Sequence, residues 1–363
     1  MPAASKPDLK SQCEIDLGFP FQAPQTPSER LRRLAARIET GADVWEYYCS
    51  GPSAEALEAR VAELTGKPAA LWFPTGTMAQ GVAARIHCDT VERPRLALHP
   101  TSHLLLHEHE GVHHLHDLEL GKVGRWNEVL NADDIPQDAG CFFLELGQRH
   151  NGGLLPSWEG LEAIKERANA YRVALHMDGA RLWSLRQAYD NRSYADICDG
   201  FESVYVSLYK DIGAMSGAVL VGSEPFIEQA RIWRARMGGM LPVGLPFIVD
   251  ALDRLDAVIA QMPELVSCAK ALANEIDRLD RLSVTPPQTN LFHIEVDASI
   301  EAIERARDRV AQEQHIWLFS RCWDYPEQAH PAIEINIGDK LLGVDRSLII
   351  NGFKRFAEAL TEV

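Results

Sequence analysis

The chain has 363 residues, 46% of them hydrophobic, and carries a formal net charge of −16 at pH 7. That size and apolar content are enough to bury a large core, and they suggest one large domain with a smaller one beside it. The strong acidic balance argues against nucleic acid or an anionic membrane as a partner, although it leaves room for local basic patches.

The N-terminal region is expected to be an arm followed by two helices. Residues 1–27 are rich in Pro, Ser and Gln, and we expect an extended arm that packs elsewhere on the protein or on a partner subunit. Apolar residues at helical spacing predict a helix over 28–40. An aromatic-rich loop at 43–49 separates it from an amphipathic helix at 54–65, for which Ser53 is the expected N-cap.

The segment 69–80 is typical of a strand, a tight turn and a helix that begins at Thr77. Backbone N–H groups at the start of a helix bind anions, and Gly76 would let the chain approach such a ligand closely. Two interpretations therefore stay open from the residues alone. The turn either forms a phosphate cup or is an ordinary strand-to-helix connection.

A histidine-rich stretch follows the strand predicted at 95–100. Residues 109–113 match the pattern H-E-x-x-H, in which two histidines of one helix bind zinc. Gly111 inside the pattern would cost such a helix about 1 kcal/mol. A zinc hydrolase built on His109 and His113 is thus a remote alternative, and a polar helix end with a loop is the simpler interpretation.

Three further apolar runs, at 141–146, 172–177 and 203–208, predict buried strands. The second run leads into Asp178, and the third into Lys210. Open α/β sheets place their chemistry at the carboxyl ends of the strands, so we expect this carboxylate and this amine at one edge of the sheet. An aspartate for a pyridinium nitrogen and a lysine for the cofactor's carbonyl carbon are what pyridoxal phosphate (PLP) requires of a protein.

These same residues carry a family resemblance. The segments His176-Met177-Asp178-Gly179-Ala180-Arg181 and Ser207-Leu208-Tyr209-Lys210 resemble the threonine aldolase/β-eliminating lyase family of PLP enzymes, over about residues 43–239. The resemblance implies an α/β fold of the PLP-dependent transferase type. It has a large domain with a mostly parallel, doubly wound sheet and a small C-terminal α/β domain.

The resemblance also implies roles for individual residues. Lys210 would hold PLP, Asp178 would pair with the ring nitrogen, and a Gly-Thr pair would hold the phosphate. His103, followed five residues later by Glu108, matches the histidine that stacks on the ring and is our candidate catalytic base. The remaining expected contacts are Gly76, Thr77, Glu145 and Ser207 for the cofactor, and Arg181 with Arg321 for the substrate carboxylate.

Strand-helix alternation up to about residue 250 predicts the doubly wound sheet. Two helices, at 246–261 and 264–279, would then lead into a small domain whose sheet is mainly antiparallel. Its expected strands lie at 290–296, 316–320 and 332–337, and its expected helices at 300–314 and 345–361. We therefore expect an arm at 1–27, a large domain at 28–250 and a small domain at 251–363.

The resemblance favours cleavage of the Cα–Cβ bond of a β-hydroxy-α-amino acid, as in L-threonine aldolase. β-Elimination or another reaction at Cα is the alternative, and an inert binding protein that kept the fold is a third. The chain departs from the family at Met240-Leu241, where an arginine normally reaches the phosphate, and at Asp211, where glycine is usual.

The cellular context is inferred from composition. Seven cysteines without metal-ligand spacing predict free, reduced thiols and no metal site, as in the cytoplasm. Residues 1–17 lack the apolar core of a signal peptide, and no apolar run reaches membrane-spanning length. We expect a cytoplasmic homodimer or homotetramer that acts on a small amino acid.

Overall fold

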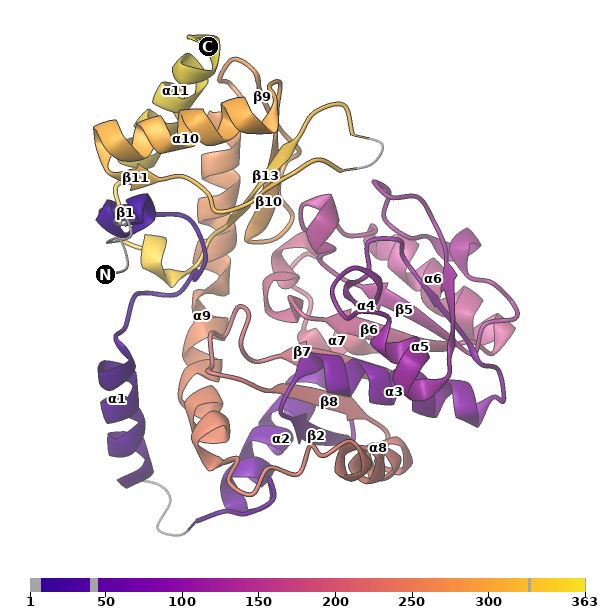
Figure 1. Ribbon diagram of the computed structural model, residues 1–363. Helices are drawn as coiled ribbons and strands as arrows, with labels where there is room; N and C mark the ends of the chain where they lie inside the picture. Colours follow the sequence, from indigo (N-terminus) through magenta and orange to yellow (C-terminus); the bar gives the residue numbers. More distant parts are fainter. Residues whose placement is uncertain (1–7, 40–44, 326–327, 363) are drawn as a thin grey trace, which may run out of the picture. The chain divides into compact units, whose positions relative to one another are not determined.

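The computed structural model describes residues 8–39, 45–325 and 328–362 (Figure 1). Residues 1–7 of the expected arm and 43–44 of the expected aromatic loop lie outside this range. Contacts divide the described chain into a small unit, within 1–24, 151–153 and 262–363, and a large unit, within 25–150 and 154–261. The domain boundaries expected after residues 27 and 250 stay a prediction, because a contact division does not test independent folding.

The large unit is built on a seven-stranded mixed sheet with the order β2-β8-β7-β6-β5-β3-β4. The pairs from β7 to β4 are parallel, whereas β8 is antiparallel to both of its neighbours. This mostly parallel α/β sheet confirms the expected fold class. The strands are β2 (Ala69–Phe73), β3 (Arg95–Leu98), β4 (Glu119–Lys122), β5 (Cys141–Glu145), β6 (Ala174–Gly179), β7 (Ser203–Ser207) and β8 (Ala218–Gly222).

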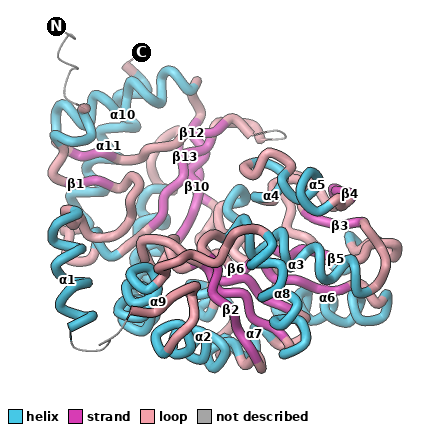
Figure 2. Tube along the Cα trace, turned by 60° about the horizontal axis from the view of Figure 1, so that its bottom comes forward, coloured by secondary structure: helices cyan, strands magenta, loops and turns pink. Residues whose placement is uncertain are grey.

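Helices cover both faces of this sheet, since parallel neighbours need crossover connections (Figures 1 and 2). α3 (Gly76–Thr90) and α8 (Glu224–Arg236) pack together on one face. α2 (Pro52–Thr65), with α7 (Tyr194–Cys198) against it, and α6 (Trp158–Tyr171) cover the other. The remaining elements are α1 (Pro27–Glu39), α4 (His103–Leu106), α5 (Gly111–His116), η2 (Ala132–Asp134), η3 (Arg149–Asn151), η4 (Leu182–Ser184) and η5 (Arg186–Ala188).

α2 begins two residues earlier than expected. Gly51, not Ser53, is its N-cap, because Pro52 occupies the first helical position. A proline suits that position, because the backbone N–H of the first helical residue makes no hydrogen bond within the helix and because the fixed φ of proline is helical. The helix ends as expected at Gly66, whose left-handed backbone (φ 66°) suits a residue without Cβ.

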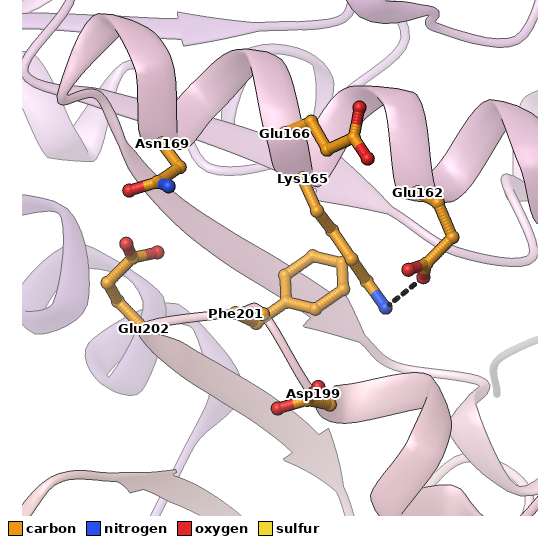
Figure 3. Close-up of a pocket in the computed structure, with 8 residues that line it drawn as sticks. Glu162, Lys165, Glu166, Asn169, Asp199, Phe201 and Glu202 are labelled. Atoms are coloured by element: carbon orange, nitrogen blue, oxygen red, sulfur yellow. Dashed lines mark hydrogen bonds and ion pairs between the residues drawn. The ribbon is translucent and has the colours of Figure 1, made fainter.

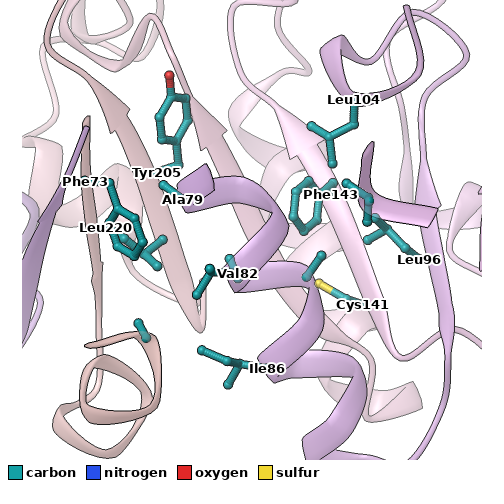
Figure 4. Packing of buried hydrophobic residues seen from close by; sticks show 14 of the residues in the cluster. Phe73, Ala79, Val82, Ile86, Leu96, Leu104, Cys141, Phe143, Tyr205 and Leu220 are labelled. Carbon is teal, nitrogen blue, oxygen red and sulfur yellow. The ribbon is translucent and has the colours of Figure 1, made fainter. Parts of the chain in front are cut away.

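The main core of the large unit lies between α3 and the sheet (Figure 4). Phe73, Leu96 and Phe143 reach it from the strands, and Val82 and Ile86 reach it from α3. Burying one such side chain stabilises the fold by roughly 1.5–3 kcal/mol. This layer therefore fixes the position of α3 relative to the carboxyl ends of the strands.

The small unit contains an antiparallel sheet, as expected, with the strand order β12-β13-β10-β9. The strand expected at 316–320 does not belong to this sheet, because β11 covers only residues 316–317 and pairs in parallel with β1. α10 and α11 pack together. The elements are η1 (Leu9–Gln12), β1 (Ile15–Asp16), β9 (Leu282–Val284), β10 (Leu291–Val296), α10 (Ile300–Gln314), β11 (Ile316–Trp317), β12 (Cys322–Trp323), β13 (Ala332–Asn336), η6 (Asp339–Leu341) and α11 (Arg346–Thr361).

One helix, α9 (Leu245–Ile276), replaces the two helices expected at 246–261 and 264–279. Pro263 lies inside this helix, although a proline lacks an N–H and crowds the preceding turn. The apolar stripe of Val258, Met262 and Val266 nevertheless continues buried across it, and that packing keeps the helix whole. In the described part of the chain, no helix is long and apolar enough to cross a membrane.

Candidate active site

Asp178 lies at the carboxyl end of the central strand β6. Its cross-strand partners are Glu145 on β5 and Tyr205 on β7, so the three side chains point to the same face of the sheet. The Asp178 carboxylate is almost fully buried. Oδ2 accepts a hydrogen bond from Gln80 Nε2 at 2.6 Å, and Oδ1 accepts one from the Ala180 backbone N–H at 3.1 Å. The carboxylate is therefore fixed in one orientation.

Arg181 is buried next to Glu145, with 3.8 Å between Nη1 and Oε1. Burial and the nearby Asp178 raise the pKa of Glu145, and the charge of Arg181 opposes them. Among the residues that the structure describes, the Nε atom of Arg181 has no hydrogen-bond partner. A buried donor without a partner is costly, so Arg181 is suited to an anionic ligand.

Lys210 follows β7 by three residues, and its backbone N–H donates to Ser207 Oγ at 3.3 Å. Burial, together with the positive charge of Arg181, lowers the pKa of the Lys210 amine. The carboxylates of Asp178 and Glu145 oppose that shift. Lys210, Asp178, Glu145 and Arg181 thus lie close together in the structure. A lowered pKa favours the neutral amine, which is the nucleophilic form.

The start of α3 lies against Tyr205. The helix begins at Gly76, one residue earlier than expected, and the Thr75 hydroxyl caps it by accepting from Met78 N at 3.3 Å. A Cβ atom on Gly76 would lie 2.3 Å from Tyr205 Oη, so only glycine fits. Burial raises the pKa of Tyr205 well above its ordinary value, and the nearby Ser207 side chain opposes that shift.

These contacts gather anion-binding groups at one place. The first N–H groups of α3, which include those of Gly76 and Thr77, lack helical partners. The protonated Tyr205 hydroxyl and the Ser207 hydroxyl add polar groups next to them. Thr77 itself is exposed. The predicted cup residues Gly76 and Ser207 thus both contact Tyr205, which the sequence analysis did not single out.

His103 begins the short helix α4, and its Nδ1 lies 2.8 Å from Glu108 Oε1. A carboxylate accepts, so Nδ1 donates, and in the neutral ring Nε2 then carries the lone pair. The second Glu108 oxygen is buried without a hydrogen-bond partner among the described residues. The predicted pair is therefore in contact, and it leaves the His103 Nε2 atom available as a base.

Besides Tyr205, two further residues near the site were not predicted from the sequence. His150 lies with its Nε2 3.0 Å from His107 Nε2, and the His107 ring is 5.0 Å from that of His103. His150 could have been predicted from the sequence, because it follows β5 closely at the carboxyl edge of the sheet. Gln80 was overlooked as part of a helix, although a buried amide between Ala79 and Val82 is unusual in an otherwise apolar stripe.

The geometry required by the zinc alternative is absent. His109 and Glu110 have left-handed backbone conformations (φ 50° and 56°), and α5 begins only at Gly111. His109 and His113 therefore do not share a helix. His113 Nδ1 instead lies 3.0 Å from the carbonyl oxygen of Leu118. Within the described ranges, no three His, Cys, Asp or Glu side chains are grouped so that they could hold a metal ion.

Arg321 belongs to the small unit. Its Nη1 atom lies 3.8 Å from Oε1 of the buried Glu334, and its side chain is about half exposed. Arg321 therefore has both an ionic partner within its own unit and a surface that solutes can reach.

A separate cavity of about 460 Å³ in the large unit is lined by acidic side chains (Figure 3). It lies at the amino end of β7, away from Asp178, because residues 199–202 precede that strand. Lys165 pairs with Glu162 at 2.8 Å, and its ammonium group lies over the rings of Trp158 and Phe201. The Lys165 ammonium group therefore already balances part of the acidic lining. We do not consider this cavity a candidate active site.

Comparisons with known proteins agree on one family. The sequence profile described as beta-eliminating lyase matches residues 25–299. A probable low-specificity L-threonine aldolase 2 of Arabidopsis thaliana is 30% identical over 74% of this chain and 79% of its own length. The low specificity L-threonine aldolase of Escherichia coli (strain K12) is 32% identical over 74% of this chain and 81% of its own.

Solved structures extend the likeness to nearly the whole chain. A candidate L-allo-threonine aldolase from Listeria monocytogenes superposes with a TM-score of 0.88 at 31% identity, covering 97% of this chain and 98% of that one. A structure of SPT with PLP reaches a TM-score of 0.74 at 14% identity, covering 96% and 88%. At that identity the second likeness concerns the fold alone.

Proposed function

Because this chain belongs to the beta-eliminating lyase family, we propose that it is a PLP-dependent lyase that cleaves the Cα–Cβ bond of a β-hydroxy-α-amino acid. The products are glycine and an aldehyde. The main support is structural: the charged side chains of Lys210, Asp178, Glu145 and Arg181 lie together at one edge of the sheet. The chain is also 30–32% identical to L-threonine aldolases.

The residues present fit PLP. Its phosphate suits the start of α3 at Gly76 and Thr77, with Ser207 beside it. Its ring nitrogen suits the buried Asp178 carboxylate, and its carbonyl carbon suits the Lys210 amine. Glu145 and His103 complete the proposed contacts. When bound, PLP supplies an electron sink for the bond broken at the substrate's α-carbon.

Arg181 is the proposed anchor for the substrate's α-carboxylate. Its guanidinium is buried and keeps an unpartnered Nε donor among the described residues, which suits bidentate binding of a carboxylate. Holding the carboxylate restricts rotation about Cα and so helps to select which bond breaks. Arg321 is proposed as a second carboxylate contact, supported by its charge and partial exposure alone.

His103 is the proposed base for the β-hydroxyl proton. Its Nε2 atom carries the lone pair because Nδ1 donates to Glu108. When Nε2 takes the proton, the charge of the imidazolium is balanced by that carboxylate. β-Elimination stays the second candidate, because the chain lacks the family's phosphate-contacting arginine at Leu241 and its glycine at Asp211.

We further propose a cytoplasmic homodimer or homotetramer. Three exposed aromatic side chains, Trp45, Tyr47 and Tyr48, gather in one short segment of the large unit and would be covered in an assembly. All seven cysteines are free thiols, which suits a reducing compartment. Light scattering on the purified protein tests the assembly, and a monomer active at nanomolar concentration would contradict it.

The reaction is tested by product analysis. The purified protein should absorb in the visible range when loaded with PLP and should release an aldehyde from threonine or phenylserine. Release of ammonia and no aldehyde, from serine and every other β-hydroxy amino acid tried, would replace aldol cleavage by elimination. A protein that takes up no PLP would contradict both reactions.

A further inference from the structure

A row of buried polar side chains runs from Asp178 into the core between α3 and the sheet. Gln80 Nε2 lies 2.6 Å from Asp178 Oδ2, and Gln80 Oε1 lies 3.1 Å from His176 Nε2. His176 Nδ1 lies 2.7 Å from Ser203 Oγ, which in turn lies 2.6 Å from His87 Nε2. All five side chains are less than 7% exposed. The row is therefore continuous and closed to solvent.

The backbone places these groups in line. His176 and Ser203 are direct partners in the pairing of β6 with β7. Gln80 and His87 are seven residues apart on α3, so two turns of helix bring them to the same face. Aromatic rings enclose the row, since Phe143 lies 4.3 Å from His176 and Phe226 stacks 4.7 Å from His87. The surroundings are thus apolar, and each polar group must be satisfied within the row.

The donors and acceptors can be assigned in only one direction. The Asp178 carboxylate can only accept, so the Gln80 amide donates to it and the Gln80 oxygen must receive a proton from His176 Nε2. A neutral His176 then accepts at Nδ1 from the Ser203 hydroxyl. The Ser203 oxygen, having given its proton, accepts from His87 Nε2. Burial supports the neutral forms, because it lowers the pKa of His87 to about 4 and that of His176 well below its ordinary value.

We propose that Gln80, His176, Ser203 and His87 form a one-directional hydrogen-bond relay that positions the Asp178 carboxylate for the cofactor's ring nitrogen. Every dipole of the relay presents its positive end toward Asp178, and hydrogen bonds in such a chain strengthen one another. The four are positioning residues, since they act on the cofactor through Asp178. The proposal rests on the proposed function in one respect only, namely that Asp178 pairs with the ring nitrogen of PLP.

The relay has a consequence for the proton between Asp178 and the cofactor's ring nitrogen. The donors of the relay all point toward the Asp178 carboxylate, so the relay should help to keep the shared proton on the ring nitrogen. Removing the donor at Gln80 should move that proton toward Asp178. Removing the Ser203 hydroxyl should act in the same direction, but less, because it is two bonds further away.

The first experiment does not depend on the cofactor. Nitrogen-15 spectra of histidine-labelled protein at pH 7 should show His176 and His87 neutral, with the proton on Nε2. Ser203→Ala should move the signals of both rings together, because its hydroxyl bridges them. A charged His176, or one protonated on Nδ1, would overturn the relay whether or not the protein binds PLP.

The second experiment uses PLP labelled with nitrogen-15 in the ring. Gln80→Met should shift the ring signal toward that of neutral pyridine and weaken PLP binding roughly tenfold, the scale of one charge-assisted hydrogen bond. Ser203→Ala should give a smaller shift of the same sign. The matched control is Thr65→Val in α2, which removes a buried hydroxyl whose bonds stay within its own helix. It should leave the ring signal unchanged.

The two experiments separate the relay from the proposed function. Ring signals equal to wild type in both Gln80→Met and Ser203→Ala would reduce the relay to a structural network and overturn the proposal. A wild-type protein that binds no PLP would instead contradict the proposed function, and the histidine protonation states would still decide the relay.

Discussion

Glu145 and Asp178 occupy directly paired positions on β5 and β6, so two carboxylates lie side by side at the sheet edge where Lys210 follows β7. Arg181 supplies the opposing positive charge, 3.8 Å from Glu145. The protonation of the Lys210 amine therefore depends on a balance between burial and Arg181 on one side and the two carboxylates on the other. This balance can be tested by changing one charge at a time.

The pH dependence of PLP uptake should report the Lys210 amine. Only the neutral amine attacks a carbonyl, and the pKa of Lys210 is lowered from its ordinary 10.5. The rate of uptake by cofactor-free protein should thus rise with pH to a plateau, with its midpoint below 10.5. Glu145→Gln removes a charge that raises this pKa, so its midpoint should move to lower pH. Stopped-flow absorbance measures both, and an unchanged or higher midpoint would contradict the assignment.

The cup at the start of α3 predicts a selective effect of Gly76→Ala. The added Cβ would lie 2.3 Å from Tyr205 Oη, and relieving that overlap should cost about 1–3 kcal/mol of stability. PLP binding should weaken more than binding of pyridoxal, which has no phosphate. Gly111→Ala is the control, because a Cβ there meets nothing within 4 Å and should stabilise α5 by up to ~1 kcal/mol. Equal losses for PLP and pyridoxal would argue against a phosphate cup.

Arg181→Lys should separate charge from geometry at the proposed carboxylate site. Lysine keeps the positive charge but cannot bind a carboxylate with two parallel N–H groups. We expect kcat/KM for threonine to fall roughly 10–100-fold, the worth of a lost charge-assisted hydrogen bond. PLP affinity should change little, since Arg181 is not proposed to contact the cofactor. Arg186→Lys, in the nearby η5, is a control that should leave both constants unaltered, because its guanidinium donates to the backbone carbonyls of Asn191 and Arg192.

The positions of the site residues that follow strands could be predicted from the sequence. They depend on local apolar patterns and on the rule that parallel strands end at the same edge of a sheet. Asp178 and Lys210 each follow a short apolar run, and parallel strands end at one edge. The His103–Glu108 contact follows from spacing within one short segment together with the family resemblance. Local signals failed where packing decided the outcome, as at Pro263, where a buried apolar stripe holds α9 continuous through a residue that usually ends a helix.

The relay behind Asp178 could not be read from the sequence. Gln80 and His87 belong to α3, whereas His176 and Ser203 belong to β6 and β7, and their contact depends on how the helix rotates on the sheet. That rotation is set by the apolar layer that includes Val82 and Ile86, and no single segment reveals it. Roles that need tertiary geometry were therefore found only in the structure.

His103→Asn distinguishes a base from a residue that merely seats the cofactor. The Nε2 lone pair of His103, oriented by Glu108, is proposed to take the β-hydroxyl proton, so the change should slow aldehyde release by ~10²–10⁴. Exchange of glycine's α-proton with solvent should suffer less, because that step can use the Lys210 amine. Glu108→Gln, which keeps an acceptor for Nδ1 but not the charge, should give an intermediate loss. Aldehyde release and deuterium exchange are measured on the same preparations, and a parallel fall of both rates in His103→Asn would limit His103 to seating the cofactor.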